Sequence, residues 1–143
     1  MTLVFEAAPI PTVAVHGSDE RIPVRRIFCI GRNYAAHARE MGKGFDRSAP
    51  VGPIYPVSAV GHPSTGAIKL TVNGQTKQEA DLADLIWSIP EMISILSHSM
   101  ELKAGDLIMT GTPAGVGPLV EGDTCVVSIE GLGDLTTHIG PKE

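Results

Sequence analysis

Apolar and polar residues alternate over short stretches of this chain, which is typical of β-strands. The clearest case is residues 67–72, where Lys and Thr separate Ile, Leu and Val. Asn73-Gly74 follows directly, and this dipeptide favours a two-residue hairpin turn. The pattern predicts strands at residues 12–16, 25–30, 67–72, 75–78, 106–110, 124–130 and 135–139, with 25–30 apolar enough to be buried.

Two segments have helical character instead. Residues 34–41 contain three alanines between Asn33 and Gly42, which predicts a short helix with Asn33 as its N-cap. Residues 81–100 carry apolar positions at helical spacing, interrupted at residues 88–91. Ser88 and Glu91 have the spacing of a capping box, so we expect two short helices here rather than one long helix.

These elements predict an α+β fold, strand-rich and mixed, with a few short helices, in a single domain over residues 1–143. The chain contains 16 Gly and 11 Pro, residues that concentrate in turns. Residues 43–63 are especially rich in proline and should form an irregular or edge-strand segment.

Charge and hydropathy narrow the class of partner. The formal net charge is −5 and no run of basic residues exists, which argues against a nucleic-acid partner. No apolar stretch approaches the roughly 20 residues of a membrane span, and the first residues do not resemble a signal peptide, so we expect a cytoplasmic protein. Cys29 and Cys125 each stand in an apolar run and are expected to be buried, unpaired thiols rather than zinc ligands.

His37 and Glu40 form the first candidate for chemistry. Three residues apart on a helix, they share a face, where a carboxylate can orient an imidazole that acts as a general base. The alternative is an exposed, solvated pair with no chemical role.

Two further stretches have catalytic or binding character. The glycine-rich residues 110–117 follow a predicted strand and can direct backbone amides and a threonine hydroxyl at an anion, or can be a structural turn. The loop lacks the Gly-Lys-Ser/Thr ending of a phosphate-binding P-loop. Lys43-Gly44-Phe45-Asp46 suits a substrate carboxylate or a metal, or can be a surface turn.

Together these stretches resemble the fumarylacetoacetate hydrolase family. The matching signatures are residues 30–40 (Ile-Gly-Arg-Asn-Tyr-Ala-Ala-His-Ala-Arg-Glu), 43–53 and 103–117. The resemblance covers nearly the whole chain and is closest to the fumarylpyruvate hydrolase branch. It implies the family's β-rich C-terminal-domain fold and hydrolysis of the C–C bond of an acylpyruvate such as fumarylpyruvate, in aromatic-compound catabolism. It also implies Mg²⁺ or Mn²⁺ as cofactor and a homodimer.

The resemblance assigns roles to particular residues. His37 and Glu40 correspond to the pair that activates water, and Lys43 to a lysine near the substrate oxygens. Substrate binding is expected at Arg32, Tyr34, Gly111 and Thr112.

One departure from the family pattern concerns the metal. The family's metal ligands, a Glu-x-Glu pair and a later Asp, precede the Lys-Gly-Phe-Asp signature, but here Met41-Gly42 runs directly into Lys43. We therefore expect an internal deletion that joins an N-terminal part (residues 1–42) to a C-terminal part (residues 43–143). Such a deletion would remove the metal ligands and leave strand edges unpaired.

Two alternatives to the hydrolase follow. One is a non-catalytic remnant that associates with a full-length homologue. The other is a keto-acid isomerase, tautomerase or decarboxylase that uses His37 and Lys43.

Overall fold

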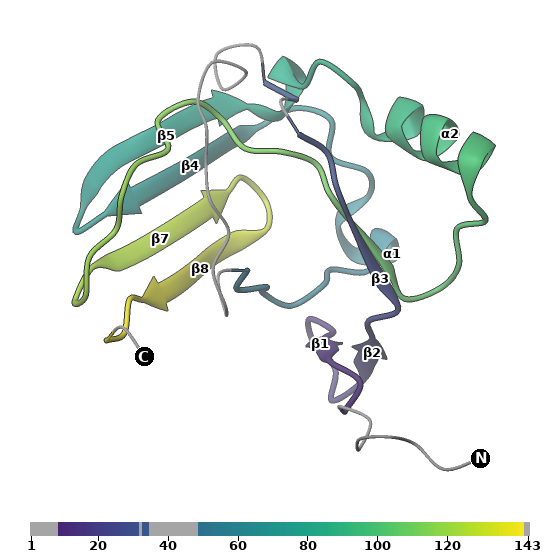
Figure 1. The fold of residues 1–143 in the computed structure, drawn as a ribbon, viewed down its shortest axis with the longest axis horizontal. Helices are drawn as coiled ribbons and strands as arrows, with labels where there is room; N and C mark the ends of the chain where they lie inside the picture. The colour runs from purple at the N-terminus through teal and green to yellow at the C-terminus, as the bar shows by residue number, and fades with distance from the viewer. Residues whose placement is uncertain (1–8, 32, 35–48, 142–143) are drawn as a thin grey trace, which may run out of the picture.

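The largest element of the fold is a four-stranded antiparallel sheet (Figure 1). The computed structural model describes residues 9–31, 33–34 and 49–141. The strand order in this sheet is β5-β4-β7-β8. Its members are β4 (Ala67–Val72), β5 (Gln75–Asp81), β7 (Thr124–Ile129) and β8 (Gly133–His138). The expected α+β, strand-rich architecture is confirmed.

The predicted hairpin joins β4 to β5. Asn73 and Gly74 have φ angles of 50° and 78°, the left-handed values that a tight hairpin turn requires at both central positions. The returning strand continues to Asp81, three residues beyond the predicted end at Gln78. Register with β4 sets this length, because pairing runs on to Ala67 and Asp81.

The remaining strands of residues 9–31, 33–34 and 49–141 form two small sheets. β1 (Thr12–Ala14) pairs antiparallel with β2 (Arg21–Pro23), and β3 (Arg26–Cys29) pairs parallel with β6 (Asp106–Met109).

Ion pairs fix the start of the parallel pair. Arg25 and Arg26 contact the Asp106 carboxylate at 3.0 and 2.8 Å, and the Asp106 side chain is only 4 % exposed. The hydrogen bond from Arg26 is the main reason why the pKa of Asp106 lies well below its usual range. These ion pairs, called the Asp106 clamp below, set the register in which β3 pairs with β6.

In the described part of the chain, three short helices lie outside the sheets. They are α1 (Val57–Val60), the 3₁₀ turn η2 (Leu82–Asp84) and α2 (Ile89–Ser99). The two helices expected within residues 81–100 are confirmed, and the Glu91 carboxylate accepts from the Ser88 amide at 2.8 Å, as in the predicted capping box. α1 was not predicted, because a single turn containing two valines has little intrinsic helical preference.

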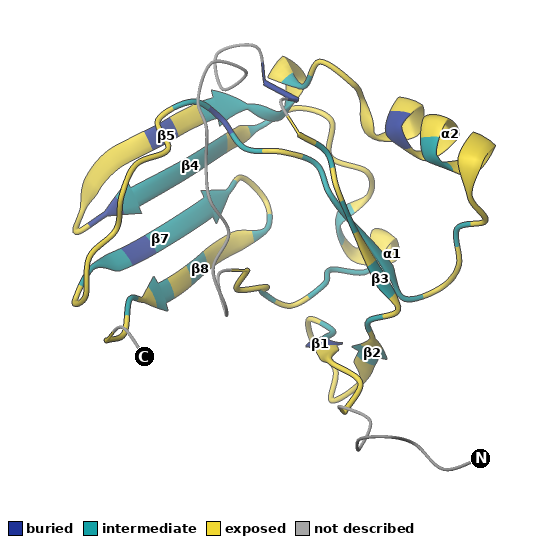
Figure 2. Ribbon diagram, viewed as in Figure 1, coloured by how far each residue is buried: buried dark blue, intermediate teal, exposed yellow. Residues whose placement is uncertain are grey.

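Few apolar side chains are buried. Figure 2 shows buried positions as isolated spots among intermediate and exposed ones. In the described part of the chain, the buried apolar residues are Val13, Tyr34, Val72, Met92 and Cys125. Large apolar side chains stay exposed elsewhere, among them Ile27 (51 %) and Ile95 (53 %).

The prediction of a buried strand at residues 25–30 was therefore wrong. β3 alternates between half-buried and exposed residues, because β6 is its one partner strand among the described residues. The same cause corrects the expectation for Cys29, which is exposed, whereas Cys125 is buried as predicted and both thiols are free. A two-stranded parallel sheet is unusual, since parallel sheets normally have both faces covered.

Candidate active site

Asn33 joins three segments that are far apart in the sequence. It follows β3, and its side chain is only 1 % exposed. Its Nδ2 donates to the Thr110 carbonyl at 2.8 Å, just after β6, and its Oδ1 accepts from the Trp87 amide at 2.8 Å, just before α2. Its own carbonyl accepts from the Ile86 amide at 2.8 Å. The end of β3, the loop after β6 and the approach to α2 therefore converge at this amide.

The described side-chain hydrogen bonds of Asn33 go to Thr110, Trp87 and Met92. The amides that Asn33 would cap as a helix N-cap belong to residues outside the described ones, so this role stays a prediction. The helix predicted from residue 34 onward lies, beyond Tyr34, outside the described residues.

The glycine-rich loop after β6 lies close against this junction. Gly111 has a φ of +108°, and a Cβ added there would stand 2.9 Å from the Asn33 Cβ. Gly115 has a φ of +106°, and a Cβ there would overlap the Lys77 backbone in β5. Both positions require glycine, because L side chains rarely adopt such φ values and the space is filled.

Gln78 holds the other side of the loop. It is the one buried residue in the centre of β5, with 7 % of its surface exposed. Its Nε2 donates to the Thr112 hydroxyl at 2.8 Å and to the Pro113 carbonyl at 2.5 Å. Figure 1 shows the loop that follows β6 running beside β5. The sequence did not mark Gln78 as a site residue, because a glutamine between charged residues on a strand looks exposed.

Tyr34 is buried beside this junction. It is 4 % exposed, and burial raises the pKa of its hydroxyl above the ordinary value. The negative charges of Asp84 and Asp81 raise the same pKa further. The hydroxyl is therefore neutral at physiological pH.

The structure thus places three of the predicted substrate-binding residues in one region. Gly111 and Thr112 lie beside the segment that contains Tyr34. Arg32, His37, Glu40 and Lys43 lie outside the described residues, so their places and roles stay predictions.

The described acids do not suit a metal ion. Within residues 9–31, 33–34 and 49–141, no group of three or more His, Cys, Asp or Glu side chains is arranged to hold one. Asp81 accepts from the Gly66 amide at 3.1 Å and the Ala83 amide at 2.8 Å, and Asp84 accepts from the Asp81 amide at 3.0 Å. These carboxylates serve backbone capping rather than a metal centre.

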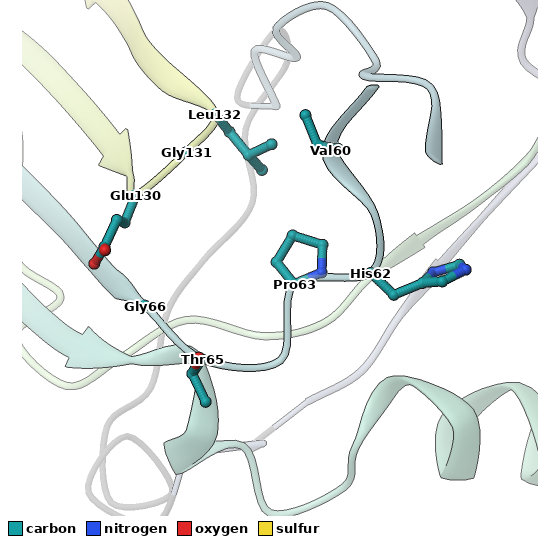
Figure 3. Close-up of a pocket in the computed structure, with 8 residues that line it drawn as sticks. All are labelled: Val60, His62, Pro63, Thr65, Gly66, Glu130, Gly131 and Leu132. Carbon is teal, nitrogen blue, oxygen red and sulfur yellow. The ribbon is translucent and has the colours of Figure 1, made fainter. Parts of the chain in front are cut away.

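A separate hollow of about 290 Å³ lies between the segment leading to β4 and the β7–β8 turn (Figure 3). His62 and Glu130 are the ionisable residues among those that line it. Figure 3 shows the His62 ring pointing away from Glu130. Glu130 also accepts from the Ala67 amide at 3.1 Å. Among the described residues that line it, the hollow therefore holds no acid–base pair.

The chain belongs to the fumarylacetoacetate hydrolase family. The family model described as fumarylacetoacetate (FAA) hydrolase C-terminal matches residues 41–140. This match includes the loop after β6 and all four strands of the large sheet.

Two curated relatives show which proteins of the family this chain is similar to. Fumarylpyruvate hydrolase from Ralstonia sp. is 41% identical over 104 residues, covering 73% of this chain and 54% of that protein. Oxaloacetate tautomerase YcgM from Escherichia coli is 41% identical over 101 residues, covering 70% and 46%. The chain thus spans about half the length of the curated relatives it matches.

A solved structure aligns more completely. Fumarylpyruvate hydrolase from Pseudomonas aeruginosa, in complex with Mn²⁺ and pyruvate, superposes with a TM-score of 0.91 at 30% identity. The alignment covers 99% of this chain and 100% of that one. Among the described residues, no helix has both the length and the apolar character needed to cross a membrane.

Proposed function

We propose that this chain hydrolyses the C–C bond of an acylpyruvate such as fumarylpyruvate. The observation that carries the proposal is the Asn33 junction, which holds the Thr110–Gly117 loop against the end of β3. His37 and Glu40 follow Asn33 by four and seven residues, so the loop lies near the start of the segment that contains them. The relatives named fumarylpyruvate hydrolase, one of them with bound pyruvate, support the same substrate class.

Substrate binding is assigned to both sides of the junction. The substrate carboxylate accepts hydrogen bonds from the Thr112 hydroxyl and from the loop backbone at Gly111. Arg32 supplies positive charge, and the neutral Tyr34 hydroxyl binds a substrate oxygen. Such groups orient the substrate and hold its carboxylate where charge develops.

The chemical step needs a base and a stabilised enolate. His37 removes a proton from water, and Glu40 orients the imidazole and stabilises its charged form. The hydroxide adds to the acyl carbonyl, the C–C bond breaks, and the electron pair remains on the pyruvate enolate, which is then protonated. Lys43 provides a cation near the substrate oxygens. The described residues do not fit a divalent ion, so no step is assigned to one.

The test is the loss of the diketone absorbance of fumarylpyruvate on addition of purified, folded chain. The assay is run with Mn²⁺ or Mg²⁺ and then with EDTA. We expect turnover, and a His37→Ala variant should lose most of it. The residual rate should no longer fall as the pH drops through the pKa of an imidazole, because the acidic limb of the pH–rate profile reports a general base. A folded protein without turnover under every condition would refute the hydrolase proposal.

A non-catalytic remnant is the second candidate. The thin core and the uncovered β3–β6 pair favour it, because unpaired strand edges and exposed apolar faces promote association. Light scattering of the chain alone should show a homodimer if copies cover these faces. Coelution with a full-length homologue in size-exclusion chromatography would support the remnant, whereas separate elution would remove its basis.

An isomerase, tautomerase or decarboxylase is the third candidate, favoured by the identity to oxaloacetate tautomerase. It predicts conversion of enol- to keto-oxaloacetate, or loss of CO₂, that resists EDTA. Fumarylpyruvate hydrolysis without either activity would exclude it.

A further inference from the structure

The hydrogen bonds of Gln78 determine the direction in which the Thr112 hydroxyl bonds. The Pro113 carbonyl can only accept, so the nitrogen end of the Gln78 amide faces it, at 2.5 Å. The same nitrogen lies 2.8 Å from Thr112 Oγ1. An amide nitrogen carries two hydrogens and accepts nothing, so both of its hydrogens are used on this loop.

Thr112 is consequently an acceptor toward Gln78. Its oxygen receives one amide hydrogen, and its own hydroxyl hydrogen must point to a different group. Gln78 is 7 % exposed, so water does not readily replace this arrangement. Gly115 lets the loop approach the Lys77 backbone closely, because a Cβ there would overlap it.

We propose that Gln78 is a positioning residue that makes Thr112 a hydrogen-bond donor toward the bound ligand. The loop then selects an acceptor, the carboxylate or enolate oxygen of a keto acid, over a cation or a neutral hydrogen-bond donor. This inference rests on the proposed function, because it assigns a direction to the hydrogen bond between Thr112 and the substrate carboxylate.

A double-mutant cycle with pyruvate as the probe tests the coupling. The variants are Gln78→Met and Thr112→Val, both neutral and close in volume to the native residues, and binding is measured by titration calorimetry with and without Mn²⁺. We expect Thr112→Val to weaken pyruvate binding about ten- to a hundredfold, the effect of losing a hydrogen bond to a charged acceptor. Gln78→Met should weaken it severalfold in the native background and leave it nearly unchanged in the Thr112→Val background.

Two controls separate positioning from folding. Thr112→Ser keeps the hydroxyl and should restore binding to within a few-fold of the native chain. Gln75→Met makes the same replacement at an exposed position on β5 and should have no effect. Independent, additive losses for Gln78→Met and Thr112→Val would overturn the proposal, because Gln78 would then act without Thr112.

A second measurement does not depend on binding. The sequence has two glutamines, Gln75 and Gln78, so the Gln78 side-chain amide can be assigned in a ¹⁵N correlation spectrum by substituting Gln75. Thr112→Val should shift one of the two Gln78 amide protons and speed its exchange with water, whereas Thr112→Ser should not. If the native chain binds no pyruvate, the proposed function fails, and the Gln78 amide signals alone test whether Gln78 donates to Thr112. Gln78 protons that are unaffected by Thr112→Val would refute the proposed role of Gln78.

Discussion

Replacement of Asn33 by alanine should be among the most damaging single changes in the described part of this protein. It leaves the Thr110 carbonyl and the Trp87 amide without the partners that they have at 2.8 Å. Each buried group that loses its partner costs about 1–3 kcal/mol, so the two together should cost about 2–6 kcal/mol. The total free energy of unfolding of a domain this size is roughly 5–15 kcal/mol, so the loss is a large share of the stability.

Asn73 provides the matched control. It is exposed, and its side chain also donates once and accepts once, to Asp123 at 2.8 Å and from the Thr124 amide at 2.9 Å. Asn73→Gly removes these bonds and keeps the positive φ accessible. Because water can replace both partners, we expect a loss below about 1 kcal/mol.

Urea unfolding measures both variants. Far-UV circular dichroism reports the whole fold, and the fluorescence of Trp87, the single tryptophan, reports the junction itself. The two probes should give one transition if the junction unfolds with the rest of the chain. Equal losses for Asn33→Ala and Asn73→Gly, or a loss below 1 kcal/mol for Asn33→Ala, would refute the reasoning from burial.

Three further predictions concern the clamp, the loop and α2. The pKa of Asp106 is lowered in the folded state, so its carboxylate stabilises the fold above its ordinary pKa, about 4, and this stabilisation fades as the pH falls further. Asp106→Asn should therefore lower Tm at pH 7 and flatten its fall below pH 4; an unchanged slope would contradict the clamp. Gly111→Ala should lower the free energy of unfolding, measured in urea, by about 1–3 kcal/mol from backbone strain alone, and by more because the new Cβ meets Asn33. Gly17→Ala is the control: Gly17 also has a positive φ, but the space around it is open, so this variant should cost less. Ser88→Ala removes the side chain that takes part in the capping box and donates to the Glu91 carboxylate at 2.6 Å. It should cost about 1 kcal/mol and reduce the helical signal at 222 nm, and an unchanged signal would show that α2 does not depend on its cap.

Local rules predicted most of the elements correctly. The hairpin at Asn73-Gly74, the two helices around Ser88 and the four strands of the large sheet follow from turn chemistry, capping and alternation over a few residues. Such features depend on neighbours in sequence, so they can be inferred without a fold.

The candidate site could be predicted only in part. The loop with Thr112 stood out as glycine-rich after a strand, and Asn33 and Tyr34 belonged to a recognisable signature. Gln78 could not be found in this way, because its importance depends on a loop 34 residues away that covers β5. The same limitation explains the wrong expectation for Cys29, since burial depends on what covers a strand and not on the strand's own composition.

The sequence by itself determined the family, the strand-rich class and the glycine-rich loop. Each of these depends on which residue types follow one another over a short stretch of sequence. Only the tertiary structure decided which side chains meet: Asn33 with Thr110 and Trp87, and Gln78 with Thr112. The physical reason is that buried polar groups must find partners wherever the chain brings them together, and those partners lie tens of residues apart along the sequence.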